Sequence, residues 1–271
     1  MRRIVPGACA AVALAACAFA HAAPVDRYPD VAAAYWVEVD GRPLWAGHAD
    51  RRLPMASLAK LMTALVAVEA GDLDAWTDVS AGAAAETGSR IGLRRGERVK
   101  RRDLLLAAFV RSANDACRAL ADAVDTTGAF VARMNARAEA LGMADTHYMN
   151  PCGHDDPAQY TSARDLAVLS RAVLAEPVLA DAAQRRELVL ATAAGRTLSM
   201  RTTNPLLDGL PGALGLKTGT TPEAGRCLVA VAERGGRRVL VVLLHAPDRW
   251  WDSVGLVELA FEAPLPDDDA R

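Results

Sequence analysis

A run of uninterrupted apolar residues near the C-terminus, 239–244, is the feature that most constrains how this chain folds. The segment consists of Val-Leu-Val-Val-Leu-Leu and comes after another apolar stretch, 226–233, across the pair Gly235-Gly236. Two apolar runs joined by a two-glycine turn are typical of a β-hairpin. A strand that is apolar on both sides has to be covered on both faces. The sequence therefore predicts a hairpin inside a sheet that is flanked by helices.

More strands are predicted at the beginning of the chain. Residues 31–39 and 43–47 have the composition of strands and are separated by the turn sequence Asp40-Gly41-Arg42. The sheet must then be assembled from both chain ends. We expect an α/β fold of the α+β type, with an antiparallel sheet that is flanked by helices and a mostly helical inserted lobe at about 72–205.

The middle of the chain has the apolar spacing of helices. The clearest patterns lie at about 116–123, 129–141 and 162–174. Ser162 and Asp165 form a variant of the capping box that opens a helix, and Pro177 interrupts the pattern. A further helix is predicted over 250–261, whereas 188–201 is ambiguous between helix and strand.

The N-terminus has the pattern of an export signal. A basic start is followed by an apolar segment, 4–19, and by the cleavage pattern Ala20-His21-Ala22. We expect a signal peptide at 1–22, one catalytic domain at 23–271 without a second C-terminal domain, and no transmembrane span in the mature chain. An exported protein of the periplasm or cell envelope is predicted. The sequence Leu14-Ala15-Ala16-Cys17 leaves open a lipoprotein that is anchored through Cys17.

Composition excludes several other classes of function. The net charge is −2 and no basic stripe is interleaved with aromatic residues, so no nucleic-acid partner is expected. The five histidines show no metal-ligand spacing, and neither a metal nor another cofactor is predicted. If the signal is removed at Ala22, Cys117, Cys152 and Cys227 remain, and at least one of the three is free or pairs elsewhere.

The first candidate for chemistry is the pair Ser57 and Lys60. Residues three apart share a face of a helix, so the hydroxyl and the amine can meet at the start of the predicted helix. The ordinary interpretation is a chance pair, because serine three residues before lysine is common. However, only three of the 31 basic residues are lysine, at 60, 100 and 217. A group that must be neutral for part of a cycle has to be lysine, because arginine keeps its proton.

Two further motifs come next, in the order that would complete a site. Ser112 and Asn114 form a Ser-x-Asn motif, and Lys217-Thr218-Gly219 lies near the C-terminal strands. Each motif alone has a plain structural interpretation as a cap, a turn or a surface charge. Together with Ser57-x-x-Lys60, they match a known catalytic signature.

With these motifs, the chain resembles the low-molecular-mass penicillin-binding proteins, the D-alanyl-D-alanine carboxypeptidases of the S11 peptidase type. The resemblance covers about 31–262, and it implies a β-lactamase/transpeptidase-like architecture for the predicted sheet and helical lobe. It extends to other segments, which are Ser-Ala-Asn-Asp-Ala-Cys at 112–117, Leu-Gly-Met at 141–143, Thr-Ser-Ala-Arg-Asp at 161–165 and Gly-Leu-Lys-Thr-Gly at 215–219. It implies a hydrolase of cell-wall organisation that acts on peptidoglycan stem peptides and is inhibited covalently by β-lactam antibiotics.

The resemblance also implies a role for each motif residue. Ser57 would attack the terminal D-Ala-D-Ala bond and form an acyl-enzyme, Lys60 would take its proton, and Ser112 would relay a proton to the leaving amine. The substrate-binding residues would be Asn114 for the peptide amide, Lys217 and Thr218 for the free carboxylate, Gly219 for room along the strand edge, and Thr220. The backbone N–H groups of Ser57 and Thr220 would bind the oxyanion. Apart from the resemblance, the location of Arg249 after the last predicted strand suggests that it adds positive charge near the carboxylate site.

Thr220 is a departure, since many family members have histidine directly after Lys-Thr-Gly. A DD-endopeptidase that cuts peptidoglycan cross-links is the alternative interpretation, because it uses the same motifs. A β-lactamase of class A would need a glutamate to activate water, and residues 145–160 contain none. A catalytically silent penicillin-binding module is disfavoured by the intact Ser57, Lys60 and Ser112.

Overall fold

The computed structural model describes residues 24–264, so the predicted signal peptide and Cys17 lie outside the described residues. The main sheet has five strands in the order β2-β1-β9-β8-β7, and each neighbouring pair is antiparallel. Its strands are β1 (Ala34–Val39), β2 (Arg42–Gly47), β7 (Ala213–Thr221), β8 (Gly225–Arg234) and β9 (Arg237–Leu244). The predicted antiparallel sheet from both chain ends is confirmed, with the N-terminal hairpin paired to β9.

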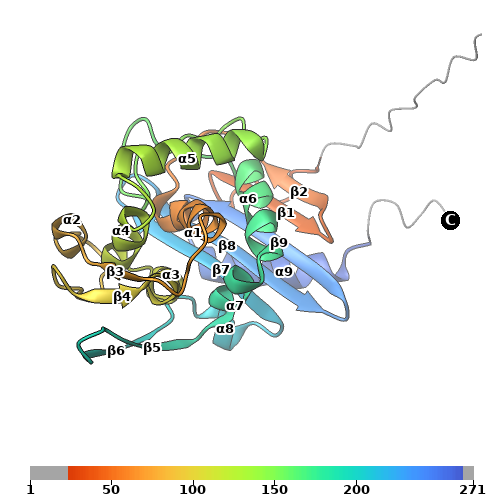
Figure 1. Cartoon of the computed structure of the whole chain (residues 1–271). Coiled ribbons are helices and arrows are strands. Elements are labelled where there is room, and N and C mark those ends of the chain that lie inside the picture. The colour runs from red at the N-terminus through yellow and green to blue at the C-terminus, as the bar shows by residue number, and fades with distance from the viewer. Residues whose placement is uncertain (1–23, 265–271) are drawn as a thin grey trace, which may run out of the picture.

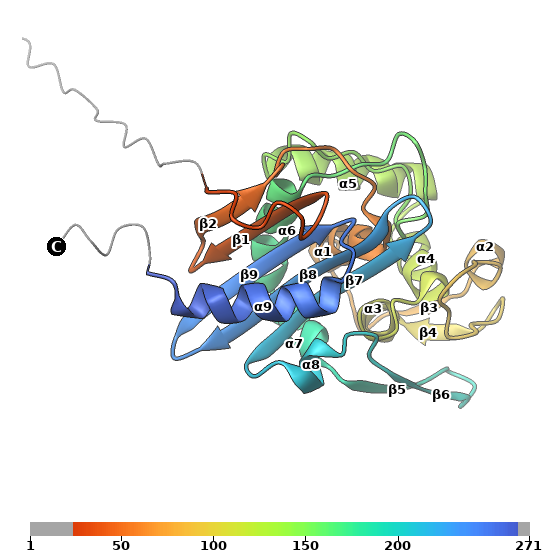
Figure 2. The same cartoon turned by 180° about the vertical axis from the view of Figure 1, so that it is seen from behind.

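The sheet is covered on both faces. Helices α1 (Ala59–Glu69) and α6 (Ala163–Ala175) lie in front of it in Figure 1, and α9 (Arg249–Glu262) crosses the opposite face in Figure 2. Residues 239–244 of the central strand β9 are all buried. The side chains of β9 alternate between two apolar clusters, one on the helical-lobe side and one under α9. This explains why the segment carries no polar residue.

The rest of the chain between α1 and β7 forms the helical lobe. Its helices are α2 (Ala81–Ala84), α3 (Arg101–Val110), α4 (Asn114–Asp122), α5 (Thr127–Ala140), α7 (Pro177–Gln184) and α8 (Leu206–Gly209). Two small hairpins accompany them, β3 (Trp76–Asp78) with β4 (Arg98–Lys100) and β5 (Glu187–Ala191) with β6 (Thr197–Arg201). The ambiguous segment 188–201 is thus a hairpin rather than a helix.

Local chemistry explains where several helices begin. Ser162 accepts a hydrogen bond from the Asp165 backbone N–H at 3.1 Å, which is the predicted cap of α6. Pro177 ends the predicted helical pattern but is itself the first residue of α7, a position where the missing N–H of proline costs nothing. Among residues 24–264, no helix has the length and apolar character needed to cross a bilayer.

Candidate active site

The serine of the first motif lies in a tight turn between β2 and α1. Ser57 is the middle residue of a single 3-10 turn, Ala56–Leu58, and Ala56 has a left-handed backbone with φ of +48°. Lys60 comes next in the first turn of α1, and its side chain is fully buried. Lys60 Nζ donates a hydrogen bond of 2.9 Å to Ser57 Oγ and one of 2.6 Å to the Cys152 carbonyl oxygen. The structure thus places the two side chains in direct contact.

Burial changes the acid–base behaviour of Lys60. Desolvation lowers the pKa of its amine to about 7, and the nearby carboxylate of Glu86 acts in the opposite direction. An amine with this pKa is partly neutral near pH 7, and a neutral amine can accept a proton from a hydroxyl. The arrangement is that of a weak nucleophile next to its base.

The second serine also contacts a buried lysine. Ser112 lies between α3 and α4 and has a positive φ of +56°. Lys217 Nζ, from β7, donates a hydrogen bond of 2.7 Å to Ser112 Oγ and one of 2.9 Å to the Thr218 carbonyl oxygen. Lys217 is 1% exposed. Burial, followed by the positive charges of Lys60 and Arg249, keeps its pKa well below the usual range.

Asn114 is the first residue of α4 and fixes a loop beside the site. Its side-chain amide donates to the Thr87 carbonyl oxygen at 2.6 Å, and its backbone N–H donates to the Ser89 carbonyl oxygen at 2.7 Å. The amide nitrogen lies 3.0 Å from the position that a Cβ on Gly88 would occupy. Asn114 therefore holds the loop 86–90 close to the second serine.

Strand β7 brings the third motif next to the nucleophile. Its outer edge is not paired with another described strand, and the strand closely approaches the Ser57 turn. A Cβ on Gly219 would lie 2.9 Å from Ala56 Cβ and 3.1 Å from the Ser57 backbone nitrogen. Glycine at this position therefore allows the close approach. Thr218 is 6% exposed, whereas Thr220 is exposed.

Arg249 supports the end of this strand from α9. One of its amino groups donates to the carbonyl oxygens of Gly219 and Cys227 and to Thr220 Oγ1, the last at 2.8 Å. Its guanidinium also stacks on the ring of Trp250. Only its place after the last strand drew attention to Arg249 in the sequence, and the structure puts its charge beside the motif.

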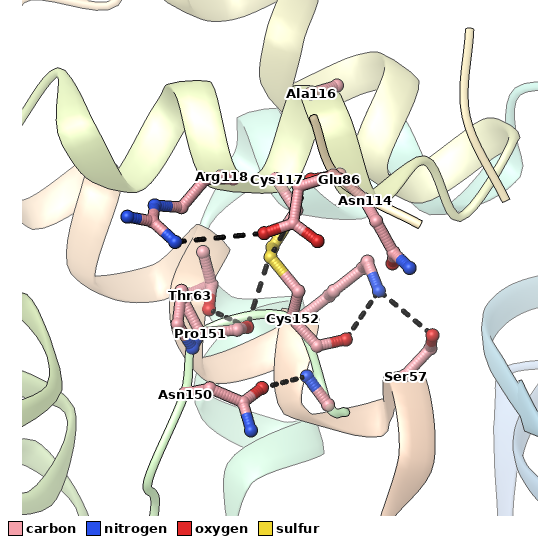
Figure 3. The surroundings of a disulfide bond; sticks show 12 residues. Ser57, Thr63, Glu86, Asn114, Ala116, Cys117, Arg118, Asn150, Pro151 and Cys152 are labelled. Atoms are coloured by element: carbon pink, nitrogen blue, oxygen red, sulfur yellow. Dashed lines mark hydrogen bonds and ion pairs between the residues drawn. A yellow bond between two sulfur atoms is a disulfide. The ribbon is translucent and has the colours of Figure 1, made fainter. Parts of the chain in front are cut away.

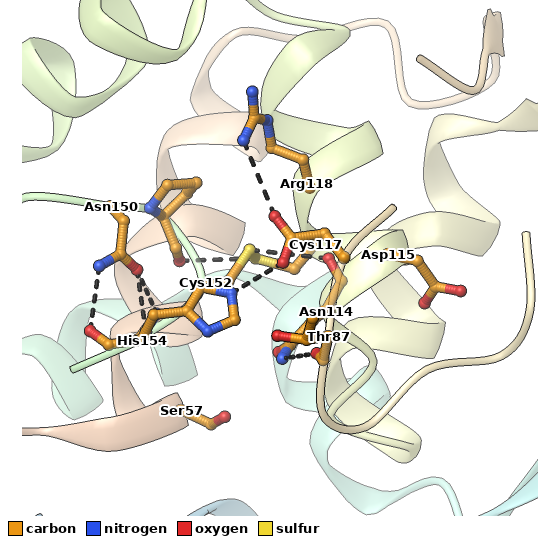
Figure 4. Close-up of polar contacts among 12 residues, drawn as sticks. Ser57, Thr87, Asn114, Asp115, Cys117, Arg118, Asn150, Cys152 and His154 are labelled. Atoms are coloured by element: carbon orange, nitrogen blue, oxygen red, sulfur yellow. Dashed lines mark hydrogen bonds and ion pairs between the residues drawn. A yellow bond between two sulfur atoms is a disulfide. The ribbon is translucent and has the colours of Figure 1, made fainter. Parts of the chain in front are cut away.

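Sequence reasoning missed an ion pair that bridges two loops near the site. His154 Nε2 lies 2.8 Å from Glu86 Oε2, and Arg118 lies 3.7 Å from the same carboxylate. Figure 4 shows His154 in the space between Asn150 and Thr87. Neither Glu86 nor His154 belongs to a spacing pattern, so only the folded chain reveals the pair.

A disulfide joins the loop of Asn150 to helix α4. Cys117 of α4 is bonded to Cys152, with the two Cα atoms 5.9 Å apart, and Cys227 is a free, buried thiol. Figure 3 shows the disulfide beside the residues that surround Ser57. The odd cysteine expected from the sequence is therefore Cys227. Within residues 24–264, no group of three or more His, Cys, Asp or Glu side chains is placed to hold a metal.

The sheet, the helical lobe and the two serine–lysine pairs define a class of protein, the serine acyl-transfer enzymes with a β-lactamase/transpeptidase-like fold. A solved structure of this class, the Streptomyces K15 DD-transpeptidase, superimposes with a TM-score of 0.80 at 29% identity. The match covers 86% of this chain and 98% of that one. The predicted fold class is confirmed.

The chain belongs to the Peptidase S11 family, described as D-alanyl-D-alanine carboxypeptidase, whose profile matches residues 20–248. It is 31% identical to the D-alanyl-D-alanine carboxypeptidase DacB2 of Mycobacterium tuberculosis over 86% of this chain and 84% of the relative. It is 36% identical to a D-alanyl-D-alanine endopeptidase of Pseudomonas aeruginosa, over 76% and 68% of the two chains. Of several other curated relatives it spans only 54%, 59% or 64% of the length. The protein is a serine-type DD-peptidase, as the motifs predicted.

Proposed function

We propose that the protein removes the terminal D-alanine from peptidoglycan stem peptides through an acyl-enzyme on Ser57. The observation that carries this proposal is the 2.9 Å contact between Ser57 Oγ and the buried amine of Lys60. In this mechanism the neutral Lys60 takes the hydroxyl proton while Ser57 Oγ attacks the carbonyl carbon of the penultimate D-Ala. The C–N bond breaks, D-alanine leaves, and water later releases the acyl group.

The second serine–lysine pair is suited to the leaving group. The departing nitrogen needs a proton, and Ser112 Oγ can relay to it the proton that Lys60 took from Ser57, while the 2.7 Å contact with Lys217 Nζ holds the Ser112 hydroxyl in place. A chain of two groups avoids an unstable amide anion in the transition state. We expect Asn114, two residues further along, to hold the substrate's peptide amide.

The exposed edge of β7 is suited to binding an extended peptide. A substrate that lies along this edge would place its reacting carbonyl between the backbone N–H groups of Ser57 and Thr220, which become the oxyanion donors. Gly219, which has no side chain, lets this strand lie directly against the Ser57 turn, so the edge that would bind the peptide is adjacent to the nucleophile. The free carboxylate would meet the Thr218 hydroxyl, with the charges of Lys217 and Arg249 behind it.

Export and inhibition are consistent with the same assignment. Stem peptides lie outside the cytoplasm, and the N-terminal pattern fits delivery to the periplasm or cell envelope, either free or as a lipoprotein through Cys17. A β-lactam presents a strained amide and a carboxylate in the same relative positions as D-Ala-D-Ala. We therefore expect it to acylate Ser57 and to remain attached.

The second candidate function is that of an endopeptidase, and the similarity to the Pseudomonas aeruginosa endopeptidase supports it. Both activities cleave a bond after D-alanine, and they differ in the group that leaves, which is free D-alanine in one case and a second stem peptide in the other. A β-lactamase is less favoured, because no glutamate occurs between 145 and 160, although Glu86 lies near Lys60.

Two measurements test the proposal. Fluorescent penicillin should label the wild type covalently, and Ser57→Ala should abolish the label while Ser112→Ala keeps a slower one. Incubation with a pentapeptide ending in D-Ala-D-Ala should release free D-alanine faster than a cross-linked dimer yields monomer. A wild type that never labels contradicts the acyl-enzyme, and faster cleavage of the dimer makes the protein an endopeptidase.

A further inference from the structure

We propose that the disulfide between Cys117 and Cys152 is a positioning device for Lys60. It holds the Cys152 carbonyl oxygen at the amine of Lys60 by tying the loop 150–153 to helix α4, and this inference rests on the proposed function of Ser57 and Lys60. Neither cysteine needs to contact the substrate. Their effect on the reaction passes through the position of one backbone carbonyl.

Cys152 both forms the disulfide and accepts the hydrogen bond from Lys60. The sulfur of Cys152 is bonded to Cys117, and its carbonyl oxygen accepts the 2.6 Å hydrogen bond from Lys60 Nζ. Cys117 lies three residues after Asn114, one turn along α4. The Cys152 sulfur is also 3.7 Å from the Asn114 carbonyl oxygen. The disulfide therefore connects the helix that carries Asn114 with the acceptor of the Lys60 amine (Figure 3).

The other interactions of the loop do not provide this connection. Asn150 Oδ1 accepts from the backbone N–H groups of Gly153 and His154, at 2.8 and 3.0 Å, which only shapes the loop itself. Thr63 Oγ1 donates to the Pro151 carbonyl oxygen at 2.5 Å, which ties the loop to α1. The ion pair from His154 to Glu86 is partly open to solvent. The disulfide is the buried covalent link from this loop to α4.

A small displacement of the loop 150–153 would disturb both Ser57 and Lys60. Gly153 packs so closely on the Ser57 turn that a Cβ there would lie 1.9 Å from the Ala56 carbonyl oxygen. The residue before it holds the Lys60 amine. Movement of this loop therefore changes the environment of Lys60 and the backbone beside Ser57 together, and a shift of about 1 Å is enough to slow an enzyme substantially.

A looser loop would also admit water to the Lys60 amine. The charged groups around this amine are Glu86 from the loop before β4 and Lys217 from β7, and Glu86 is itself paired with His154 and Arg118. Breaking the disulfide changes none of these charges. It weakens the desolvation that keeps Lys60 neutral, so more alkaline conditions would be needed to deprotonate it.

The experiment measures acylation by fluorescent penicillin against pH in the wild type and in Cys117→Ala/Cys152→Ala. We expect the acidic limb of the profile to move up by about one pH unit, and acylation near pH 7 to fall about fivefold. A structural role alone would lower the melting temperature without moving the limb. Val257→Ala, in α9 on the opposite face of the sheet, is the matched control for lost stability.

Reduction of the folded wild type tests the same point if the double variant does not fold. A phosphine reductant breaks the S–S bond, each sulfur takes a proton from water, and the phosphine becomes its oxide. The reduced wild type should show the shifted profile, and re-forming the disulfide should restore the original one. An unmoved limb after verified reduction overturns the positioning role, whereas no labelling at any pH in any form contradicts the proposed function instead.

Discussion

The two serine–lysine pairs can be compared as two regions of one site. Both lysines are buried and both amines are within hydrogen-bond distance of a serine hydroxyl, at 2.9 Å for Ser57 and 2.7 Å for Ser112. The first pair comes from one helical turn, whereas the second joins residues 105 positions apart. The pairs also differ in the second acceptor of the amine. Lys217 donates to the carbonyl of the next residue in its own strand, whereas Lys60 donates to a loop.

This difference shows how the same contact can be held in two ways. The sheet ladder fixes the position of Lys217 and its acceptor together, since β7 is paired with β8 from Ala213 to Thr221. The Cys152 carbonyl oxygen, which accepts from Lys60, lies on a loop that no sheet ladder holds in position. In our proposal the disulfide holds this loop. The electrostatic surroundings differ as well, because Glu86 raises the pKa of Lys60 while Lys60 and Arg249 lower that of Lys217.

The charges of the two lysines are therefore linked. Protonation of one amine disfavours protonation of the other, since the positive charge of Lys60 lowers the pKa of Lys217. A substrate carboxylate beside Thr218 would favour the protonated form of Lys217 and, through it, the neutral form of Lys60. Binding of the correct substrate would in this way prepare the base for its step.

Substitution by arginine should give the largest difference in activity loss between the two lysines. Lys60→Arg keeps a charge but cannot lose its proton, so we expect acylation by penicillin to fall about 10³-fold. Lys217→Arg keeps the charge near Thr218, and a smaller loss of about 10²-fold is expected from the bulkier side chain. The measurement is the acylation rate constant of each folded variant. Equal losses would mean that the two pairs do not have different roles.

A neutral residue at position 86 tests how the electrostatic surroundings of Lys60 differ from those of Lys217. Glu86 raises the pKa of Lys60, so Glu86→Gln should lower that pKa and move the acidic limb of acylation down by about half a pH unit. Activity rises as Lys60 loses its proton, and the variant should therefore be faster than the wild type below pH 7. Glu97→Gln, which removes an ion pair with Arg196, is the control. A limb that moves upward would contradict the assignment of Lys60 as the base.

Position 220 should show the smallest effect. Thr220→Val removes the hydroxyl that accepts from Arg249, but Arg249 keeps the carbonyl oxygens of Gly219 and Cys227. The proposed oxyanion donor is the backbone N–H, which valine retains, so acylation should change by no more than about fivefold. Rate constants for penicillin and for the pentapeptide provide the measurement. A loss as large as that of Lys217→Arg would show that the hydroxyl itself acts in the site.

Much of the sheet-side region could be predicted from the sequence. The uninterrupted apolar run at 239–244 indicated a strand covered on both faces, and the two-glycine turn fixed its partner. The contact between Ser57 and Lys60 was expected from their spacing on a helical turn. These features depend on local chemistry, and local chemistry is visible in the order of the residues.

The loop-side region could not be predicted in the same way. Cys117 and Cys152 are 35 positions apart, and three cysteines leave the pairing open. The ion pair of Glu86 and His154 joins two loops without a sequence pattern. In the hairpin at 187–201, exposed and more buried side chains alternate along two short strands. Segments this short cannot be distinguished from one side of an amphipathic helix until the pairing of the two strands is known. Each of these depends on how distant segments pack.

The left-handed backbone at Ala56 and Ser112 has a consequence for laboratory evolution. Residues other than glycine in this region cost about 1–3 kcal/mol each, and here both adjoin or carry a serine of the site. A screen for heat resistance alone would reward sequences that relax these two turns, and relaxation would move each hydroxyl away from its lysine. Directed evolution of a more thermostable variant of this enzyme therefore requires catalytic turnover to be measured in every round of selection.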